Sequence, residues 1–136
     1  MDALSAARFG NLENVRIIQR KPPTALMDAA EAAKLDAPRT ISTATAREVG
    51  RQFPKNANIA VSAALAACAL DETRVDVIAD PSAKLNIAEI HASGDFGELE
   101  VKISNAPTEN KRTSMMAIYA ALSTIARRSD TLLFGA

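Results

Sequence analysis

A predicted hairpin in the second half of the chain constrains the fold most. Two runs, Asn86–Ser93 and Glu98–Ser104, flank Gly94-Asp95-Phe96-Gly97, a connection whose terminal glycines are typical of hairpin turns. Along the second run, charged residues alternate with apolar ones, which are Leu99, Val101 and Ile103. This period of two predicts an antiparallel strand with one face packed on a core and the other in water.

The remaining elements follow in mixed order along the chain. Runs rich in β-branched residues predict strands at 15–20, 41–44 and 74–79. Helical patterns cover residues 2–8, 24–37, 45–52, 59–70 and about 113–128. Thr45 followed by Glu48 has the pattern of a capping box at a helix start. We therefore expect residues 1–136 to form a single α+β domain, a mostly antiparallel mixed sheet with helices packed on it.

Composition excludes several classes of function. Sixteen basic and sixteen acidic residues balance, whereas nucleic-acid binders usually carry a basic excess, so we expect no nucleic-acid partner. The longest apolar run, 59–70, is about half the length of a membrane-spanning helix. The N-terminus lacks the pattern of a signal peptide, so no membrane association and a cytoplasmic location are expected. One cysteine and one histidine favour a reducing compartment and no zinc site.

A set of sequence blocks points to a known family. The most specific is Phe53-Pro54-Lys55-Asn56-Ala57-Asn58-Ile59-Ala60. The others are Asp2-Ala3-Leu4, Arg20-Lys21-Pro22-Pro23, Thr73-Arg74-Val75, Ala79-Asp80-Pro81, Gly94-Asp95-Phe96-Gly97, and Asn110 with Thr113-Ser114. In order and spacing these blocks resemble the C-terminal half of the L-aspartate dehydrogenases. The resemblance covers nearly all 136 residues.

The resemblance implies an activity and a set of partners. Such enzymes pair a Rossmann domain with an α+β domain that supplies substrate and subunit contacts. They move a hydride between Cα of L-aspartate and NAD or NADP, giving an imine that water converts to oxaloacetate and ammonia or that feeds NAD biosynthesis. We thus expect L-aspartate as substrate and a homo-oligomer. The chain contains no Gly-x-Gly-x-x-Gly fingerprint, so we expect the Rossmann half to be absent and this chain alone to bind no cofactor.

The family's catalytic histidine falls at a position where this chain has alanine. The family pattern is Asn-x-His-Glu-Ile, and here the segment reads Asn86-Ile87-Ala88-Glu89-Ile90. His91 is a weak substitute, because alternation in a strand points residues 88 and 91 to opposite faces, roughly 10 Å apart along it. Only a bulge would bring His91 to the other side. The alternative is a solvated histidine beside Glu89, so no catalytic residue is intact.

Each of the other candidate site residues can be interpreted either as a binding residue or as a purely structural one. The resemblance gives Asn58 a contact with the cofactor, and asparagine also suits the N-cap of a helix beginning at Ile59. A dicarboxylate substrate needs cations, and those available are Lys55, Arg112, Arg20 and Lys21. Thr113 and Ser114 are either a helix cap or a carboxylate site at the positive helix end.

Two further residues are expected to have structural roles only. Cys68, inside the apolar run 59–70, is expected to be inert core, and Asp80 before Pro81 is expected to cap a turn.

Three functions remain open for the chain. The first is the substrate and oligomerisation domain of an aspartate dehydrogenase. The second is an inactive, truncated homologue acting as a dimerising module, favoured by Ala88 and the missing fingerprint. A third is a related oxidoreductase whose substrate needs no histidine at position 88.

Overall fold

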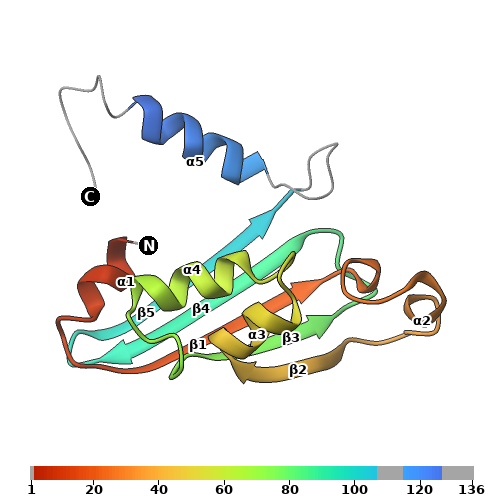
Figure 1. Ribbon diagram of the computed structural model, residues 1–136, viewed down its shortest axis with the longest axis horizontal. Helices are drawn as coiled ribbons and strands as arrows, with labels where there is room; N and C mark the ends of the chain where they lie inside the picture. Colours follow the sequence, from red (N-terminus) through yellow and green to blue (C-terminus); the bar gives the residue numbers. More distant parts are fainter. Residues whose placement is uncertain (1, 107–114, 127–136) are drawn as a thin grey trace.

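The computed structural model describes residues 2–106 and 115–126, and its centre is one five-stranded sheet (Figure 1). The strands are β1 (Leu12–Lys21), β2 (Arg39–Thr45), β3 (Arg74–Ala79), β4 (Asn86–Gly94) and β5 (Gly97–Asn105). Their order across the sheet is β2-β3-β1-β4-β5. The β1–β3 pair is parallel, and the other three neighbouring pairs are antiparallel. The predicted mixed, mostly antiparallel sheet is confirmed.

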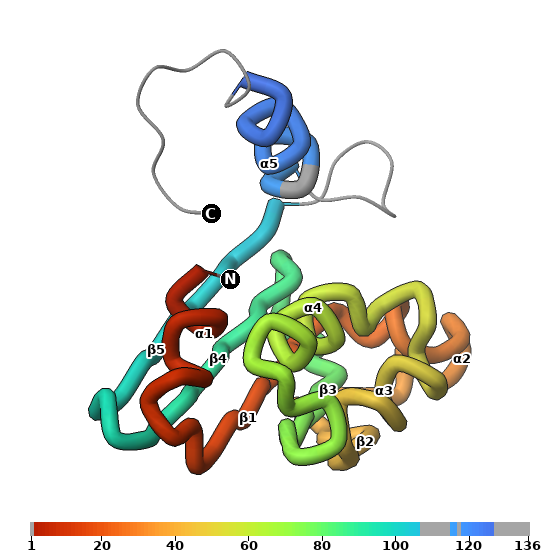
Figure 2. The backbone as a smooth tube through the Cα atoms, turned by 60° about the vertical axis from the view of Figure 1, so that its left-hand side comes forward, coloured from red at the N-terminus to blue at the C-terminus, as the bar shows by residue number. Residues whose placement is uncertain are grey.

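The first half of the chain contains α1 (Asp2–Ala7), the 3₁₀ turn η1 (Pro23–Ala25), α2 (Ala29–Ala32), α3 (Ala46–Gln52) and α4 (Asn58–Ala66). Of these, α1, α3 and α4 cover one face of the sheet. Figures 1 and 2 show α1, α3 and α4 on the same side of the strands. Within the described ranges no helix lies on the opposite side, which we call the open face. A helix layer on one side of a mixed sheet is the α+β arrangement that the sequence predicts.

The core lies between α3, α4 and the centre of the sheet. Fully buried side chains come from strands β1 and β3, such as Ile17 and Val75, and from α3 through Val49. Helix α4 contributes three buried alanines to this core, Ala60, Ala63 and Ala64. Because alanine has a single methyl group, α4 can lie close to the sheet. Each fully buried isoleucine or valine contributes roughly 1.5–3 kcal/mol.

The predicted hairpin is present with a shorter connection than expected. Strands β4 and β5 pair as far as Gly94 opposite Gly97, so the turn consists of Asp95 and Phe96. Glycine is required at the two positions for different physical reasons. Gly97 has a φ of +96°, which favours glycine, whereas a Cβ on Gly94 would lie 2.5 Å from the carbonyl oxygen of Asn11.

Two helix predictions are wrong in extent. The predicted helix 24–37 is reduced to η1 and α2, separated by Leu26–Asp28. The apolar run 59–70 leaves the helix after Ala66, because Cys68 has a φ of +53°. Cys68 is therefore exposed rather than core, and Arg8 Nη1 donates to its Sγ at 2.9 Å. Leu65 on the same helix is exposed as well.

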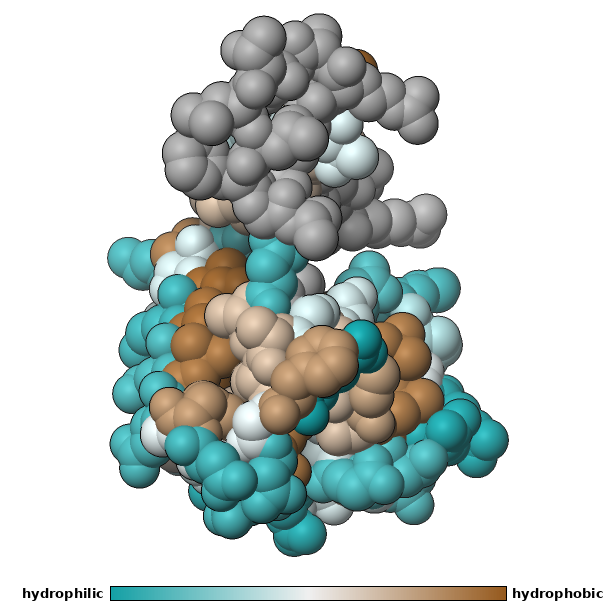
Figure 3. Space-filling view, turned by 90° about the vertical axis from the view of Figure 1, so that its left-hand side faces the viewer, coloured by the Kyte–Doolittle hydropathy of each residue, from teal (hydrophilic) through white to brown (hydrophobic). Residues whose placement is uncertain are grey.

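The last described helix, α5 (Met115–Ala126), carries many of the exposed apolar side chains. Four residues spaced for one face of this helix, Met116, Tyr119, Ala120 and Ser123, are exposed. A second exposed apolar group lies at the end of the molecule that bears α1 and the β4–β5 turn (Figure 3), where Phe9 and Phe96 are found. In the described ranges no helix is long and apolar enough to cross a membrane.

Candidate functional site

The pairing of strand β4 determines the direction of the side chain at position 88, where the family pattern has its histidine. Ala88 lies opposite Gln19 of β1 and Ile103 of β5, on the helix-covered face, and is buried. His91 is half-buried on the open face. The pairing of β4 runs from residue 87 to 93 with no register shift toward β1 or β5. The bulge that His91 would need in order to replace residue 88 is thus not found in this strand, which is described throughout.

A hydrogen-bonded cluster joins the end of β1 to the loop between α3 and α4. Lys21 Nζ donates to the backbone oxygen of Asn56 at 2.9 Å and to its Oδ1 at 3.3 Å. Asn56 Nδ2 in turn donates to the carbonyl oxygen of Ala25 at 2.9 Å. Burial lowers the pKa of Lys21 below its usual value. These bonds hold the 53–57 loop, which contains Lys55, over the end of β1 on the helix-covered face.

Arg20 points to the other face of the sheet. Its Nη1 lies 3.1 Å from Asp80 Oδ2. Asp80 Oδ1 accepts from the Ser82 backbone N–H at 2.8 Å and from the Ser82 hydroxyl at 2.7 Å. The hydroxyl bond from Ser82 is the main cause that lowers the pKa of Asp80. The predicted turn cap at Asp80 is confirmed, and Arg20 is engaged in holding that turn.

Asn58 does not cap α4 as the sequence suggested. The N-cap is Ala57, which makes no side-chain cap hydrogen bond, and Asn58 is the first helical residue. The chain turns into the helix one residue earlier than expected, which leaves the Asn58 side chain exposed. An exposed carboxamide beside an uncapped helix start fits a contact with another amide or an anion.

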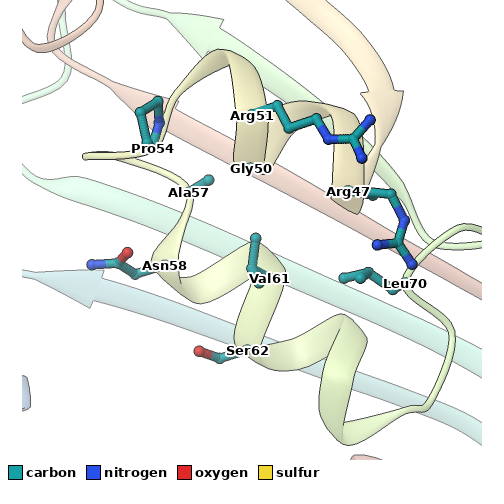
Figure 4. A pocket seen from close by; sticks show the side chains of 9 residues that line it. All are labelled: Arg47, Gly50, Arg51, Pro54, Ala57, Asn58, Val61, Ser62 and Leu70. Atoms are coloured by element: carbon teal, nitrogen blue, oxygen red, sulfur yellow. The ribbon is translucent and has the colours of Figure 1, made fainter.

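Asn58 lines a groove of about 410 Å³ between α3 and α4 (Figure 4). Its floor is mainly apolar, with Val61 and Leu70, and arginines stand on the α3 side. Arg47 is held by Asp71 through two hydrogen bonds of 2.6 and 2.9 Å. Lys55, Lys21 and Ala88 are not part of this groove.

The structure brings together some of the expected residues and separates others. Lys55 and Asn58 share one loop and helix start, which Lys21 ties to the end of β1. Arg20 and His91 lie on the open face. Thr113, Ser114 and Arg112 lie outside the described residues. Asn56 is a further residue of this cluster; it belongs to the most specific motif, but nothing in the sequence marks its side chain as an anchor for Lys21.

Comparison with known proteins identifies the family. The family model described as aspartate dehydrogenase, C-terminal, matches residues 2–128. The chain belongs to this family. L-Aspartate dehydrogenase of Pseudomonas aeruginosa is 37% identical, over 97% of this chain and 52% of the relative. That of Methanosarcina mazei is 36% identical, over 99% of this chain and 53% of the relative.

A solved structure confirms the fold of this aspartate dehydrogenase C-terminal domain. The crystal structure of aspartate dehydrogenase from Thermotoga maritima superposes with a TM-score of 0.77 at 29% identity. The match covers 98% of this chain and 51% of the other. The chain spans about half the length of the curated relatives it matches.

Proposed function

We propose that residues 1–136 are a single substrate-binding and oligomerisation domain of an NAD(P)-dependent L-aspartate dehydrogenase. The observation that carries the proposal is the Lys21–Asn56 hydrogen bond of 2.9 Å. It anchors the most specific family motif at the same end of the sheet face as residue 88. Relatives named L-aspartate dehydrogenase support the substrate class.

In this proposal the chain's residues bind and orient L-aspartate. Lys55 and Lys21 supply positive charge for one carboxylate, and Arg112, Thr113 and Ser114 are the candidates for the other. Asn58, exposed at the start of α4, contacts the nicotinamide carboxamide. The nicotinamide, when bound, supplies the hydride acceptor for Cα.

The proposed site has no ionisable side chain at position 88 to accept a proton during the reaction. When the Cα–H hydride leaves and the C=N bond of iminosuccinate forms, the ammonium group must lose protons. Ala88 has no ionisable group, and His91 faces away from this side of the sheet. Solvent is then the proton acceptor, so we expect turnover to be slow rather than absent.

A second candidate function is an inactive dimerising module. It is favoured by the buried methyl group of Ala88, at the position of the family histidine. The two candidates differ in one measurement. The domain is joined to the dinucleotide-binding half of the Pseudomonas aeruginosa relative, and L-aspartate-dependent NADH formation is followed by absorbance. Slow turnover supports the dehydrogenase; NAD binding with no turnover, before and after histidine is introduced at position 88, supports the module.

A further inference from the structure

Strand β5 has one edge with no partner strand within residues 2–106 and 115–126. It is the last strand in the order of the sheet (Figure 2), and the strand paired with it is β4. On the side away from β4, the backbone N–H and C=O groups of an edge strand are available to a further strand. Such an edge can bind an extended segment through main-chain hydrogen bonds.

The β5 edge lacks two features that commonly prevent edge strands from pairing. Natural edges are often protected by prolines or by bulges. Strand β5 contains no proline, and its nine residues pair with β4 without a register shift. The opposite edge strand, β2, has a register shift between Thr40 and Ser42. Of the two edges, β5 is therefore the one suited to accept another strand.

The side chains of β5 are complementary to those of a second copy of the same strand. Antiparallel pairing centred on Val101 places Glu100 opposite Lys102 of the second copy, and Lys102 opposite its Glu100. On the other face of the strand, Leu99 lies opposite Ile103, and Val101 lies opposite its own copy. Opposite charges and apolar side chains that face each other across neighbouring strands stabilise the pair.

Charge selects this register among the neighbouring ones. Centring the pair on Glu100 or on Lys102 would place that residue opposite its own copy. Centring it on Leu99 would place Glu98 opposite Glu100. Like charges directly opposite each other destabilise a strand pair. The register centred on Val101 avoids these contacts and pairs each charge beside the axis with its opposite.

The surroundings of β5 in a single chain favour the same partner. Lys102 Nζ lies 2.7 Å from Glu89 Oε1, so Glu89, Lys102 and the second copy's Glu100 would form a row of alternating charge on the open face. On the helix-covered face, Leu99 and Val101 are half-buried. A second copy would cover more of their apolar surface.

We propose that two copies of this chain join through antiparallel pairing of their β5 strands, with a two-fold axis at Val101. One sheet then runs through both copies. The inference rests on the oligomerisation role in the proposed function and names its surface, whereas dehydrogenase activity is not needed for it.

A charge exchange across the axis tests both the surface and the register. Glu100→Lys places lysine opposite lysine at both sides of the axis, and Lys102→Glu places glutamate opposite glutamate. Sedimentation equilibrium should therefore give each variant alone a lower average mass than the parent chain, with dimer affinity reduced roughly tenfold or more. An equimolar mixture restores opposite charges at both positions, so the parent mass should return.

Glu72→Lys is the matched control, because it makes the same charge change at an exposed turn outside β5. It should leave the mass unchanged. Thermal melting shows that each variant is folded. Hydrogen exchange then reports on the strand itself: at equal concentration, β5 backbone amides should exchange faster in Glu100→Lys than in the parent chain.

Four results would overturn the inference. Parent-like masses for both variants would assign the oligomer to another surface, such as α5, and leave the oligomerisation role intact. A mixture that stays at low mass would exclude this register. A monomeric parent would remove the oligomerisation role as well. A monomer whose β5 amides are all protected would show that a segment of the same chain occupies the edge.

Discussion

Ala88 pairs with Gln19 on the helix-covered face of the sheet, while His91 pairs with Arg16 on the open face. The two candidate positions for a catalytic base are therefore separated by the sheet itself. Their different surroundings give each substitution a distinct expected effect.

Ala88→His should accelerate the joined enzyme that carries the dinucleotide-binding half of a relative. A positioned histidine typically contributes about 10²–10⁴-fold, or roughly 3–5 kcal/mol of barrier. The initial rate of NADH formation from L-aspartate measures the gain, with thermal melting to confirm folding. His91→Ala is the matched control and should leave the rate nearly unchanged. An essential His91 combined with an inert Ala88→His would move the base to the open face.

The chain by itself should not bind NAD or NADP measurably. Asn58 offers one or two hydrogen bonds to the nicotinamide, each contributing roughly 0.5–1.5 kcal/mol. Their sum stays below the roughly 4 kcal/mol that corresponds to millimolar affinity. Titration of NADH, monitored by its fluorescence, should therefore show no saturation. Tight binding would require a phosphate site elsewhere in the chain.

The chain should self-associate at micromolar concentration, because exposed apolar side chains are concentrated on α5. Leu122 on this helix is 55% exposed, and Leu65 on α4 is 57% exposed. Light scattering should give the mass of an oligomer for the parent chain and for Leu65→Glu, and a smaller mass for Leu122→Glu. A monomer mass for the parent chain would refute the expectation.

Stability should decrease in acid through Asp76. Burial alone would raise the pKa of this carboxyl, but hydrogen bonds from Thr43 at 2.7 Å and Arg16 at 2.7 Å outweigh it and lower that pKa below 3.8. The stabilisation is complete above the unfolded-state pKa and is lost as pH falls through the lower folded-state value. Urea denaturation between roughly pH 5 and pH 2 measures the slope.

Thr43→Val tests the contribution of the hydroxyl group to that slope. Loss of its hydrogen bond should bring the pKa of Asp76 closer to the ordinary value, so that the pH dependence becomes shallower. Thr40→Val, at an exposed position of the same strand, should leave the slope unchanged. Equal slopes in all three proteins would mean that other carboxyls control the acid response.

Local patterns predicted the parts of the fold that depend on neighbours in sequence. The capping box is present as expected: Thr45 Oγ1 accepts from the Glu48 backbone N–H, and the Glu48 carboxylate accepts from the Thr45 backbone N–H. The hairpin is correct for the same reason. The extent of the 59–70 helix was not predictable, because its apolar composition continues past the left-handed residue Cys68.

The site was predictable only where a motif marks it. Lys55 and Asn58 belong to a specific block, so sequence alone selected them. Ala88 lies opposite Gln19, a residue 69 positions away that strand pairing alone brings beside it. Register between distant strands is a tertiary property, which single-sequence patterns do not encode.

The regular pairing of β4 with both neighbours from residue 87 to residue 93 has an evolutionary consequence. The backbone at position 88 is held by β1 and β5 whatever side chain it carries, so the direction of that side chain is inherited from the sheet. Loss of a base there requires one substitution and no decay of the scaffold. Its recovery is an equally short mutational path, open for as long as selection preserves the three paired strands.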